Sequence, residues 1–345
     1  MTPVSNAIEA TRIALEENTD ANWLIGFSGG KDSTAMLCVI VAALKKCSVM
    51  PRSVELIYCD TGVENPVLDR YVKSLCDRLT KEFEHDGLPL QIQILSAPVE
   101  QRFFTKLIGR GYPSPTNSFR WCTKNLRINP VAKYIAEKAR ENAIVALGMR
   151  RDESEQRKRS IQKNGDERWQ VQREAKSRYR VFLPVLEMTV SDVWDTIYFS
   201  DQPNSIDSHA LERLYRDASG ECPIIKSPQA PPCGSGRFGC WTCTVVRQDK
   251  SAKQLIAAGY EELIPFLQFR NWLTEIRNEP DLRWPVRRNG RASMGPFTLA
   301  ARRMILATLE NLERETETSV VGDAERAEIE RLWALDVPLE AQILA

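Results

Sequence analysis

The chain has 345 residues, which is enough for one large α/β domain with additions or for two domains. Its 47 basic and 46 acidic side chains give a net charge of +1, which excludes a globally basic nucleic-acid-binding protein, so any contact with DNA or RNA must come from a local patch. No apolar run approaches the roughly 18–20 residues that a membrane span needs, and the N-terminus has no secretory pattern, so we expect a cytoplasmic protein without a membrane partner.

Apolar, β-rich segments alternate with helical patterns in the first half of the chain. Four segments predict strands, at residues 23–27, 54–59, 90–95 and 143–147. Between them, helical spacing covers residues 34–46, 66–83 and 130–141. Strands separated by helices predict an α/β fold with a doubly wound parallel sheet. Because ligands of such sheets bind beyond the carboxyl ends of the strands, the segments that follow the strands are candidates for a single nucleotide site.

The second half begins with residues 150–180, which are polar and basic without apolar periodicity. This composition indicates either a mobile insertion over the site or a solvated loop. Ordered core is expected to resume at residues 181–185, and helices are predicted at residues 189–198, 250–278 and 297–315. The predicted organisation is an α/β domain over residues 1–200, a cysteine-rich and mainly helical region over 201–315, and a helical tail over 316–345.

The segment after the first predicted strand reads Gly-Phe-Ser-Gly-Gly-Lys-Asp-Ser-Thr, from residue 26 to residue 34. Glycine can adopt backbone angles closed to other residues and lets a phosphate approach the main chain, and the N–H groups of the helix that follows favour an anion. The spacing is not that of a Walker A loop. It resembles the SGGxDS loop of the ATP pyrophosphatase (PP-loop) superfamily, which cleaves ATP between the α and β phosphates and adenylates a substrate. The resemblance implies an ATP site made by Ser28, Gly29, Gly30, Lys31, Asp32 and Ser33, with catalytic roles for Ser28, Lys31 and Asp32.

Asp60, Thr61 and Gly62 follow the second predicted strand. A carboxylate and a hydroxyl at a strand end suit contacts to an adenosine, or to a metal beside the pyrophosphate. Sulfate-activating PP-loop enzymes show a similar Asp-Thr-Gly. We therefore expect all three residues in the nucleotide site, with a catalytic role for Asp60.

Gly148 and Arg150 follow the fourth predicted strand, in a segment that resembles the Gly-x-Arg…Ser…Arg segment of the 3′-phosphoadenylylsulfate (PAPS) reductase family. Arginine presents a planar fork that grips phosphate oxygens bidentately. Gly148 and Arg150 are therefore expected in the nucleotide site, where Arg150 binds ATP phosphates and has a catalytic role, and Arg151 and Arg157 are expected to face the acceptor. A surface charge run is the alternative interpretation.

Five of the nine cysteines are candidates for a metal or redox site: Cys122, Cys222, Cys233, Cys240 and Cys243. The last two form a C-x-x-C pair, and further thiols close by make a tetrathiolate plausible for zinc or a [4Fe–4S] cluster, which spacing alone does not separate. Assimilatory adenylylsulfate reductases hold such a cluster through positions that resemble Cys122, Cys240 and Cys243. That resemblance implies these three as metal ligands. Because Trp121 stands where those enzymes have a further cysteine, another ligand is needed, for which Cys233 is the first candidate and Cys222 is either the alternative ligand or the persulfide carrier.

Together these motifs resemble the DndC and SspD proteins of DNA phosphorothioation, PP-loop relatives of the PAPS reductases. Residues 220–223, 233–246 and 295–299 add to this likeness, and the cysteine stretch is its most specific part. The resemblance implies an enzyme that activates a DNA phosphate with ATP and Mg²⁺ and passes sulfur through an iron–sulfur cluster or a persulfide. Its implied partners are DNA, a cysteine desulfurase as sulfur donor and other phosphorothioation proteins. A tRNA thiolation enzyme and a non-catalytic, zinc-stapled scaffold that binds nucleotide remain alternatives.

A nucleic-acid surface is predicted over residues 282–303, which contain no Asp or Glu. Its basic residues are Arg283, Arg287, Arg288, Arg291, Arg302 and Arg303. Trp284 stands among them, and basic charge beside an aromatic ring suits phosphate contact and base stacking. A solvated loop beside a helix is the alternative.

Overall fold

The computed structural model describes residues 2–139, 142–171, 179–219 and 238–344. The chain divides into two compact units and crosses between them several times. Unit 1 comprises residues 1–59, 67–95 and 131–237, and unit 2 comprises residues 60–66, 96–130 and 238–345. The domain boundaries expected after residues 200 and 315 stay a prediction.

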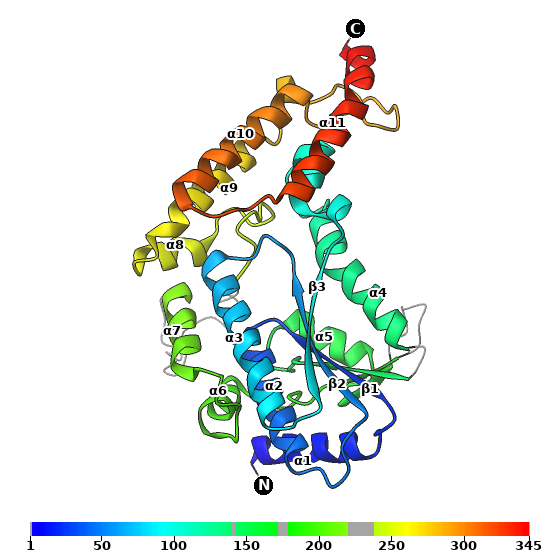
Figure 1. Cartoon of the computed structure of the whole chain (residues 1–345), viewed down its shortest axis with the longest axis vertical. Helices are drawn as coiled ribbons and strands as arrows, with labels where there is room; N and C mark the ends of the chain where they lie inside the picture. Colours follow the sequence, from blue (N-terminus) through cyan, green and yellow to red (C-terminus); the bar gives the residue numbers. More distant parts are fainter. Residues whose placement is uncertain (1, 140–141, 172–178, 220–237, 345) are drawn as a thin grey trace. The chain divides into compact units, whose positions relative to one another are not determined.

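Unit 1 is built on a six-stranded sheet with the order β3-β2-β1-β4-β6-β5 (Figure 1). The strands are β1 (Asn22–Phe27), β2 (Ser53–Asp60), β3 (Leu90–Ser96), β4 (Ala143–Leu147), β5 (Trp169–Val171) and β6 (Arg180–Phe182). β1 pairs in parallel with β2 and β4, and β4 pairs in parallel with β6. Only the short β5 is antiparallel to its neighbour β6 among the pairings described. The predicted α/β fold is confirmed as a mostly parallel sheet with flanking helices.

The helices of unit 1 include α2, which opens directly after β1 and is buried along its whole length from Thr34 to Leu44. Its run of Ala, Leu, Val and Ile side chains is apolar all round, as expected for a helix that packs against α1 and α6 as well as the sheet. The helices that lie wholly in unit 1 are α1 (Pro3–Glu16), α2 (Lys31–Leu44), α5 (Glu155–Lys163), α6 (Val190–Phe199) and α7 (Ser208–Ser219). α3 (Pro66–His85) and α4 (Asn129–Lys138) each begin in unit 2 and continue in unit 1.

The segment predicted as a mobile or solvated loop, residues 150–180, contains regular structure, and that prediction is wrong for α5 and β5. Ser154 caps α5 through its side chain, and Ile161 anchors the otherwise polar helix because it is fully buried. Trp169 of β5 packs its ring 4.7 Å from that of Phe182 on β6. One apolar anchor per element is too weak a periodic signal to detect in the sequence.

Unit 2 is mainly helical, with α8 (Lys250–Ala257), α9 (Ile264–Ile276), α10 (Leu299–Thr316) and α11 (Asp323–Leu344). Its core is rich in aromatic side chains, and the ring of Trp241 lies 5.0 Å from Phe266 and 5.9 Å from Phe104. The helix predicted over residues 250–278 is two helices, because Gly259 adopts a left-handed conformation (φ 104°) that ends α8. Within the described part of the chain, no helix has both the length and the apolar character of a membrane span.

Candidate phosphate site and thiol cluster

The predicted phosphate loop lies between β1 and α2 of unit 1. β1 ends at Phe27 and α2 begins at Lys31, so the first N–H groups of α2 follow the two glycines directly. Gly29 has φ 71°, and a Cβ atom at this position would lie 2.1 Å from Cγ2 of Val72. Because only glycine fits both the backbone angle and the space, Gly29 is required for this turn. Gly148 is similarly constrained, since a Cβ there would lie 2.8 Å from the Asp32 carbonyl oxygen.

The two serines of the loop bond to one another and to the turn. The hydroxyl of Ser33 donates to the Gly30 carbonyl at 2.9 Å, and the two serine hydroxyl oxygens lie 3.1 Å apart. The Ser28 N–H also donates to the Ser33 hydroxyl, at 3.3 Å. Ser33 therefore holds the loop from inside, while the exposed Ser28 is the hydroxyl that solvent reaches.

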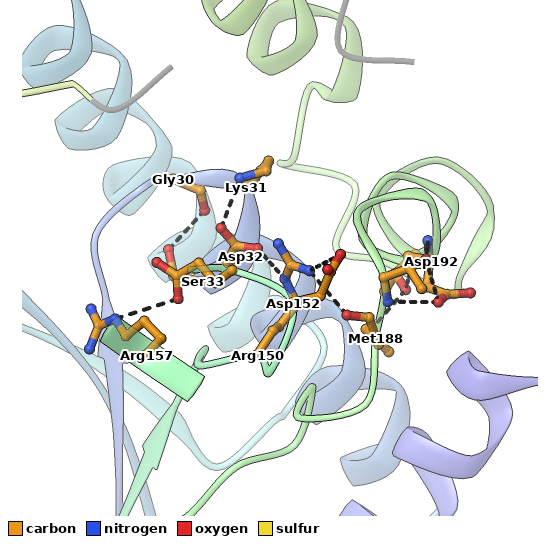
Figure 2. A network of polar contacts seen from close by, with 12 residues as sticks. Gly30, Lys31, Asp32, Ser33, Arg150, Asp152, Arg157, Met188 and Asp192 are labelled. Carbon is orange, nitrogen blue, oxygen red and sulfur yellow. Dashed lines mark hydrogen bonds and ion pairs between the residues drawn. The ribbon is translucent and has the colours of Figure 1, made fainter. Parts of the chain in front are cut away.

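A network of charged side chains surrounds the start of α2 (Figure 2). Lys31 Nζ lies 2.9 Å from one carboxylate oxygen of Asp32, and Arg150 Nε lies 2.6 Å from the other. Burial acts to raise the pKa of Asp32, but Lys31 and Arg150 outweigh it and hold the pKa below its usual value. Asp32 is therefore an anion at neutral pH, and it orients the lysine of the loop.

Arg150 is 1% exposed, and its Nη1 donates to the Met188 carbonyl at 3.0 Å (Figure 2). In this structure its guanidinium is engaged by Asp32 and the main chain, so it positions the loop, and direct contact with ATP stays a prediction. Arg151 forms ion pairs with Asp166 and Glu187, and the exposed Arg157 lies 3.5 Å from Glu153. That Arg151 and Arg157 face the acceptor stays a prediction.

The other predicted nucleotide residues, Asp60, Thr61 and Gly62, belong to unit 2. Oδ1 of Asp60 accepts from the Gly62 N–H at 2.8 Å, and Gly62 has φ 71°. The Thr61 hydroxyl donates to Oε1 of Glu64 at 3.0 Å. The segment is thus a tight turn in which the carboxylate of Asp60 supports its own backbone.

The same turn contacts the C-x-x-C pair. Glu64 and Cys240 form an antiparallel β-bridge, and Sγ of Cys240 lies 3.9 Å from Oγ1 of Thr61, 4.0 Å from Oε2 of Glu64 and 3.9 Å from Nη2 of Arg127. Arg127 also pairs with Glu64 at 2.7 Å. Burial, and next the charge of Glu64, raise the pKa of Cys240 to about 12 although the neighbouring Arg127 acts to lower it, so the thiol is protonated unless a metal binds it.

Cys122 and Cys240 both pack against the core of unit 2. The chain turns after Cys240, so that the Cys243 N–H donates to the Cys240 carbonyl at 3.0 Å. Burial raises the pKa of Cys122, and Cys243 adds to this. Among the described residues, no group of three or more His, Cys, Asp or Glu side chains is placed to hold a metal. Cys222 and Cys233 lie outside the described residues. The described thiols alone therefore do not make a cluster site, and the four-thiolate set stays a prediction.

The basic stretch of unit 2 is partly structural. Arg302 is fully buried and pairs with Asp336 at 2.6 Å, and Arg288 pairs with the same carboxylate. Arg283 is buried and donates to the Gly295 carbonyl. Trp284 is 1% exposed, so the prediction that it stacks on a base is wrong: its ring fills the core beneath two guanidinium groups.

The exposed arginines of the stretch are Arg287, Arg288, Arg291 and Arg303, of which Arg288 is held by Asp336. Two antiparallel bridges, Arg283 with Phe297 and Val286 with Ala292, make residues 283–297 a hairpin. Arg287 and Arg291 lie at its tip, where the Arg287 N–H donates to the Arg291 carbonyl at 2.9 Å. The tip thus exposes two arginines that form no ion pair with a carboxylate among the described residues.

Glu64 and Arg127 were assigned no role from the sequence. Glu64 lies within the segment that follows the second strand, so its position alone could have indicated a place in the site. Arg127 offers no such signal, because its partner Glu64 is 63 residues away in the chain. Tyr215 is a third such residue, because its hydroxyl reaches the phosphate loop from α7.

The model of the phosphoadenosine phosphosulfate reductase domain matches residues 22–246 of this chain, about two thirds of its length. Uncharacterized protein MJ0066 of Methanocaldococcus jannaschii is 27% identical over 143 residues, which are 41% of this chain and 26% of that protein. This chain therefore spans about a quarter of the length of that relative.

Two solved structures show a weak likeness to this fold. FMN adenylyltransferase of Candida glabrata, in complex with FAD and inorganic pyrophosphate, has a TM-score of 0.39 and 13% identity, with 90% of this chain and 82% of that chain covered. The U34-tRNA thiolase NcsA of Methanococcus maripaludis, solved with its [4Fe–4S] cluster, has a TM-score of 0.37 and 13% identity, with 79% and 78% covered. Neither likeness bears on substrate or mechanism.

Proposed function

Since this chain belongs to the phosphoadenosine phosphosulfate reductase domain family, we propose that it is an ATP pyrophosphatase that adenylates a phosphate oxygen of DNA as the first step of sulfur insertion into the DNA backbone. The observation that supports this most is the Ser28–Ser33 loop, which leads into α2 and contains Gly29, a position whose backbone angle and lack of space require glycine. Such a helix start, with a lysine oriented by a carboxylate, suits the binding of pyrophosphate.

The chemistry needs activation because an unactivated phosphodiester oxygen is a poor leaving group. A non-bridging DNA oxygen attacks the α-phosphorus of ATP, an O–P bond forms, and the bond to the β-phosphate breaks as pyrophosphate leaves. The N–H groups of the loop and Lys31 stabilise the charge on that pyrophosphate, and Mg²⁺ bound to the triphosphate supplies further neutralisation. AMP is then the leaving group when sulfur attacks the DNA phosphorus.

A cysteine persulfide supplied by a cysteine desulfurase is the proposed sulfur donor. Its terminal sulfur attacks the phosphorus and AMP leaves. A second thiol then cleaves the S–S bond, which leaves the phosphorothioate on DNA and a disulfide that a cellular thiol reduces. The contacts of Cys240 with Thr61 and Glu64 support a functional link between this thiol region and the Asp60–Gly62 turn.

DNA is proposed as the acceptor, and the Arg287–Arg291 hairpin tip supports this because exposed arginines suit phosphate contacts. To test the proposal, the full chain purified without oxygen is incubated with ATP, Mg²⁺, cysteine and a cysteine desulfurase, and with either duplex DNA or bulk tRNA. Mass spectrometry of nuclease digests that detects phosphorothioate dinucleotides from DNA supports the proposal. Thiolated tRNA bases without DNA modification would replace it with tRNA thiolation, and a zinc-bound protein with no turnover would replace it with a nucleotide-binding scaffold.

A further inference from the structure

Tyr215 of α7 reaches the phosphate loop from a distant part of the sequence. Its hydroxyl oxygen accepts a hydrogen bond from the Lys31 N–H at 3.0 Å. A Cβ atom added to Gly30 would also lie 3.0 Å from this hydroxyl. Lys31 is the first residue of α2, and the first N–H groups of a helix have no partner within it. The hydroxyl therefore lies at the end of α2 where an anion is expected to bind.

The position of the Tyr215 ring is fixed by its neighbours. The Trp194 ring of α6 packs edge-on against it, with ring centres 5.8 Å apart and planes at 85°. The ammonium group of Lys31 lies 5.3 Å from the centre of the Tyr215 ring. Tyr215 thus contacts both the N–H and the ammonium group of Lys31, and these contacts hold the tyrosine in a fixed position beside the loop.

We propose that Tyr215 is a further residue of the phosphate site. Its hydroxyl accepts a hydrogen bond from the Lys31 N–H, the same group that donates to a nucleotide phosphate when one binds. The inference rests on the proposed function, because it takes the loop to bind phosphate. An N–H group makes one good hydrogen bond, and a charged phosphate oxygen is a stronger acceptor than a neutral hydroxyl. Nucleotide binding therefore displaces the Tyr215 hydroxyl from Lys31 and weakens the attachment of α7 to the loop.

The test measures the affinity for ATP with Mg²⁺, and separately for pyrophosphate, by calorimetry. Tyr215→Phe keeps the ring that contacts Trp194 and Lys31 and removes only the competing hydroxyl, so both ligands should bind about twofold to tenfold more tightly, the range for one neutral hydrogen bond. Tyr198→Phe is the matched control, because the Tyr198 hydroxyl bonds to Glu212 of the same helix α7 and lies outside the loop. Its affinity should equal that of the wild type.

Hydrogen exchange of residues 208–219 provides a second readout. Pyrophosphate should speed exchange in the wild type, and in Tyr215→Phe exchange should already be fast without it. An unchanged or weaker affinity of Tyr215→Phe, with wild-type binding intact, overturns the role of Tyr215 alone. If neither the wild type nor Tyr215→Phe binds ATP or pyrophosphate, the proposed function fails and this inference fails with it.

Discussion

Nε of Arg150 donates to Oδ1 of Asp32 across 2.6 Å, and through this contact a residue that follows β4 sets the geometry of the loop that follows β1. The arginine is buried, and it also donates to the Met188 carbonyl. Asp32 also pairs with Lys31, so the three charged side chains form one connected cluster at the start of α2. The arginine thus positions the loop.

Replacement of Arg150 by lysine should lower pyrophosphate release from ATP by at least tenfold, about 1.4 kcal/mol of transition-state stabilisation. A single ammonium group cannot reproduce the fork that serves both Asp32 and Met188, so Lys31 loses its fixed position. Arg12→Lys on α1 is the control, since Arg12 pairs only with Glu9 and Glu16 among the contacts described. Wild-type turnover in a folded Arg150→Lys protein would show that the guanidinium fork is not needed.

The backbone of Gly29 gives a second prediction. Gly29→Ala should abolish pyrophosphate release and destabilise unit 1, because it adds a left-handed alanine and a clash with Val72. Gly87→Ala isolates the first effect, since Gly87 has φ 65° with no atom within 4 Å of the added Cβ, and should cost about 1–2 kcal/mol without loss of turnover. The free energies of unfolding in urea compare the two variants. Equal losses would mean that the Val72 contact is unimportant, and a Gly29→Ala, Val72→Ala double variant should recover part of the stability.

The exposed arginines of the hairpin give a third. Arg287→Gln with Arg291→Gln should weaken binding to all DNA sequences and reduce the slope of log affinity against log salt by roughly 0.9 for each lost phosphate contact. Arg288 and Arg302 are left intact because Asp336 holds them and their loss would destabilise unit 2. Lys250→Gln with Lys253→Gln, two exposed lysines of α8, is the matched control. An unchanged slope would place the DNA surface elsewhere.

The fourth prediction concerns the thiols. Protein purified without oxygen should contain iron and sulfide, and Cys240→Ser or Cys243→Ser should lose both, because each removes half of a chelating pair. Cys233→Ser should do nearly the same. Loss of iron in Cys122→Ser would support the reductase-like ligand set, whereas loss in Cys222→Ser with retention in Cys122→Ser would mean that the ligands are local in sequence. Cys47→Ser, remote from these thiols in the sequence, should keep its iron.

Zinc in a one-to-one ratio with no iron would exclude the cluster. The pyrophosphatase activity of the cysteine variants is the second readout. It should survive, because adenylation uses the Ser28–Ser33 loop, whereas transfer of sulfur to DNA should not.

The sequence predicted the sheet and the phosphate loop because both depend on local patterns. Four apolar segments are strands, and the glycines between the first strand and its helix are where a turn requires them. The basic runs indicated exposed charge, but Arg150 and Arg302 within them are buried and held by carboxylates of the chain itself. Their partners, Asp32 and Asp336, are distant in sequence, and no periodic signal connects them. Tyr215 was missed for the same reason.

The most direct test of the central claim is which bond of ATP the protein breaks. ATP labelled in the α-phosphate is incubated with the full chain, Mg²⁺, DNA, cysteine and a cysteine desulfurase, so that sulfur can release the AMP from DNA, and the products are separated by chromatography. The account predicts AMP and pyrophosphate, with at least tenfold less in Ser28→Ala, Gly30→Ala and Asp32→Ala, about 1.4 kcal/mol. Release of ADP and phosphate, or equal turnover by a folded Gly30→Ala protein, would contradict it.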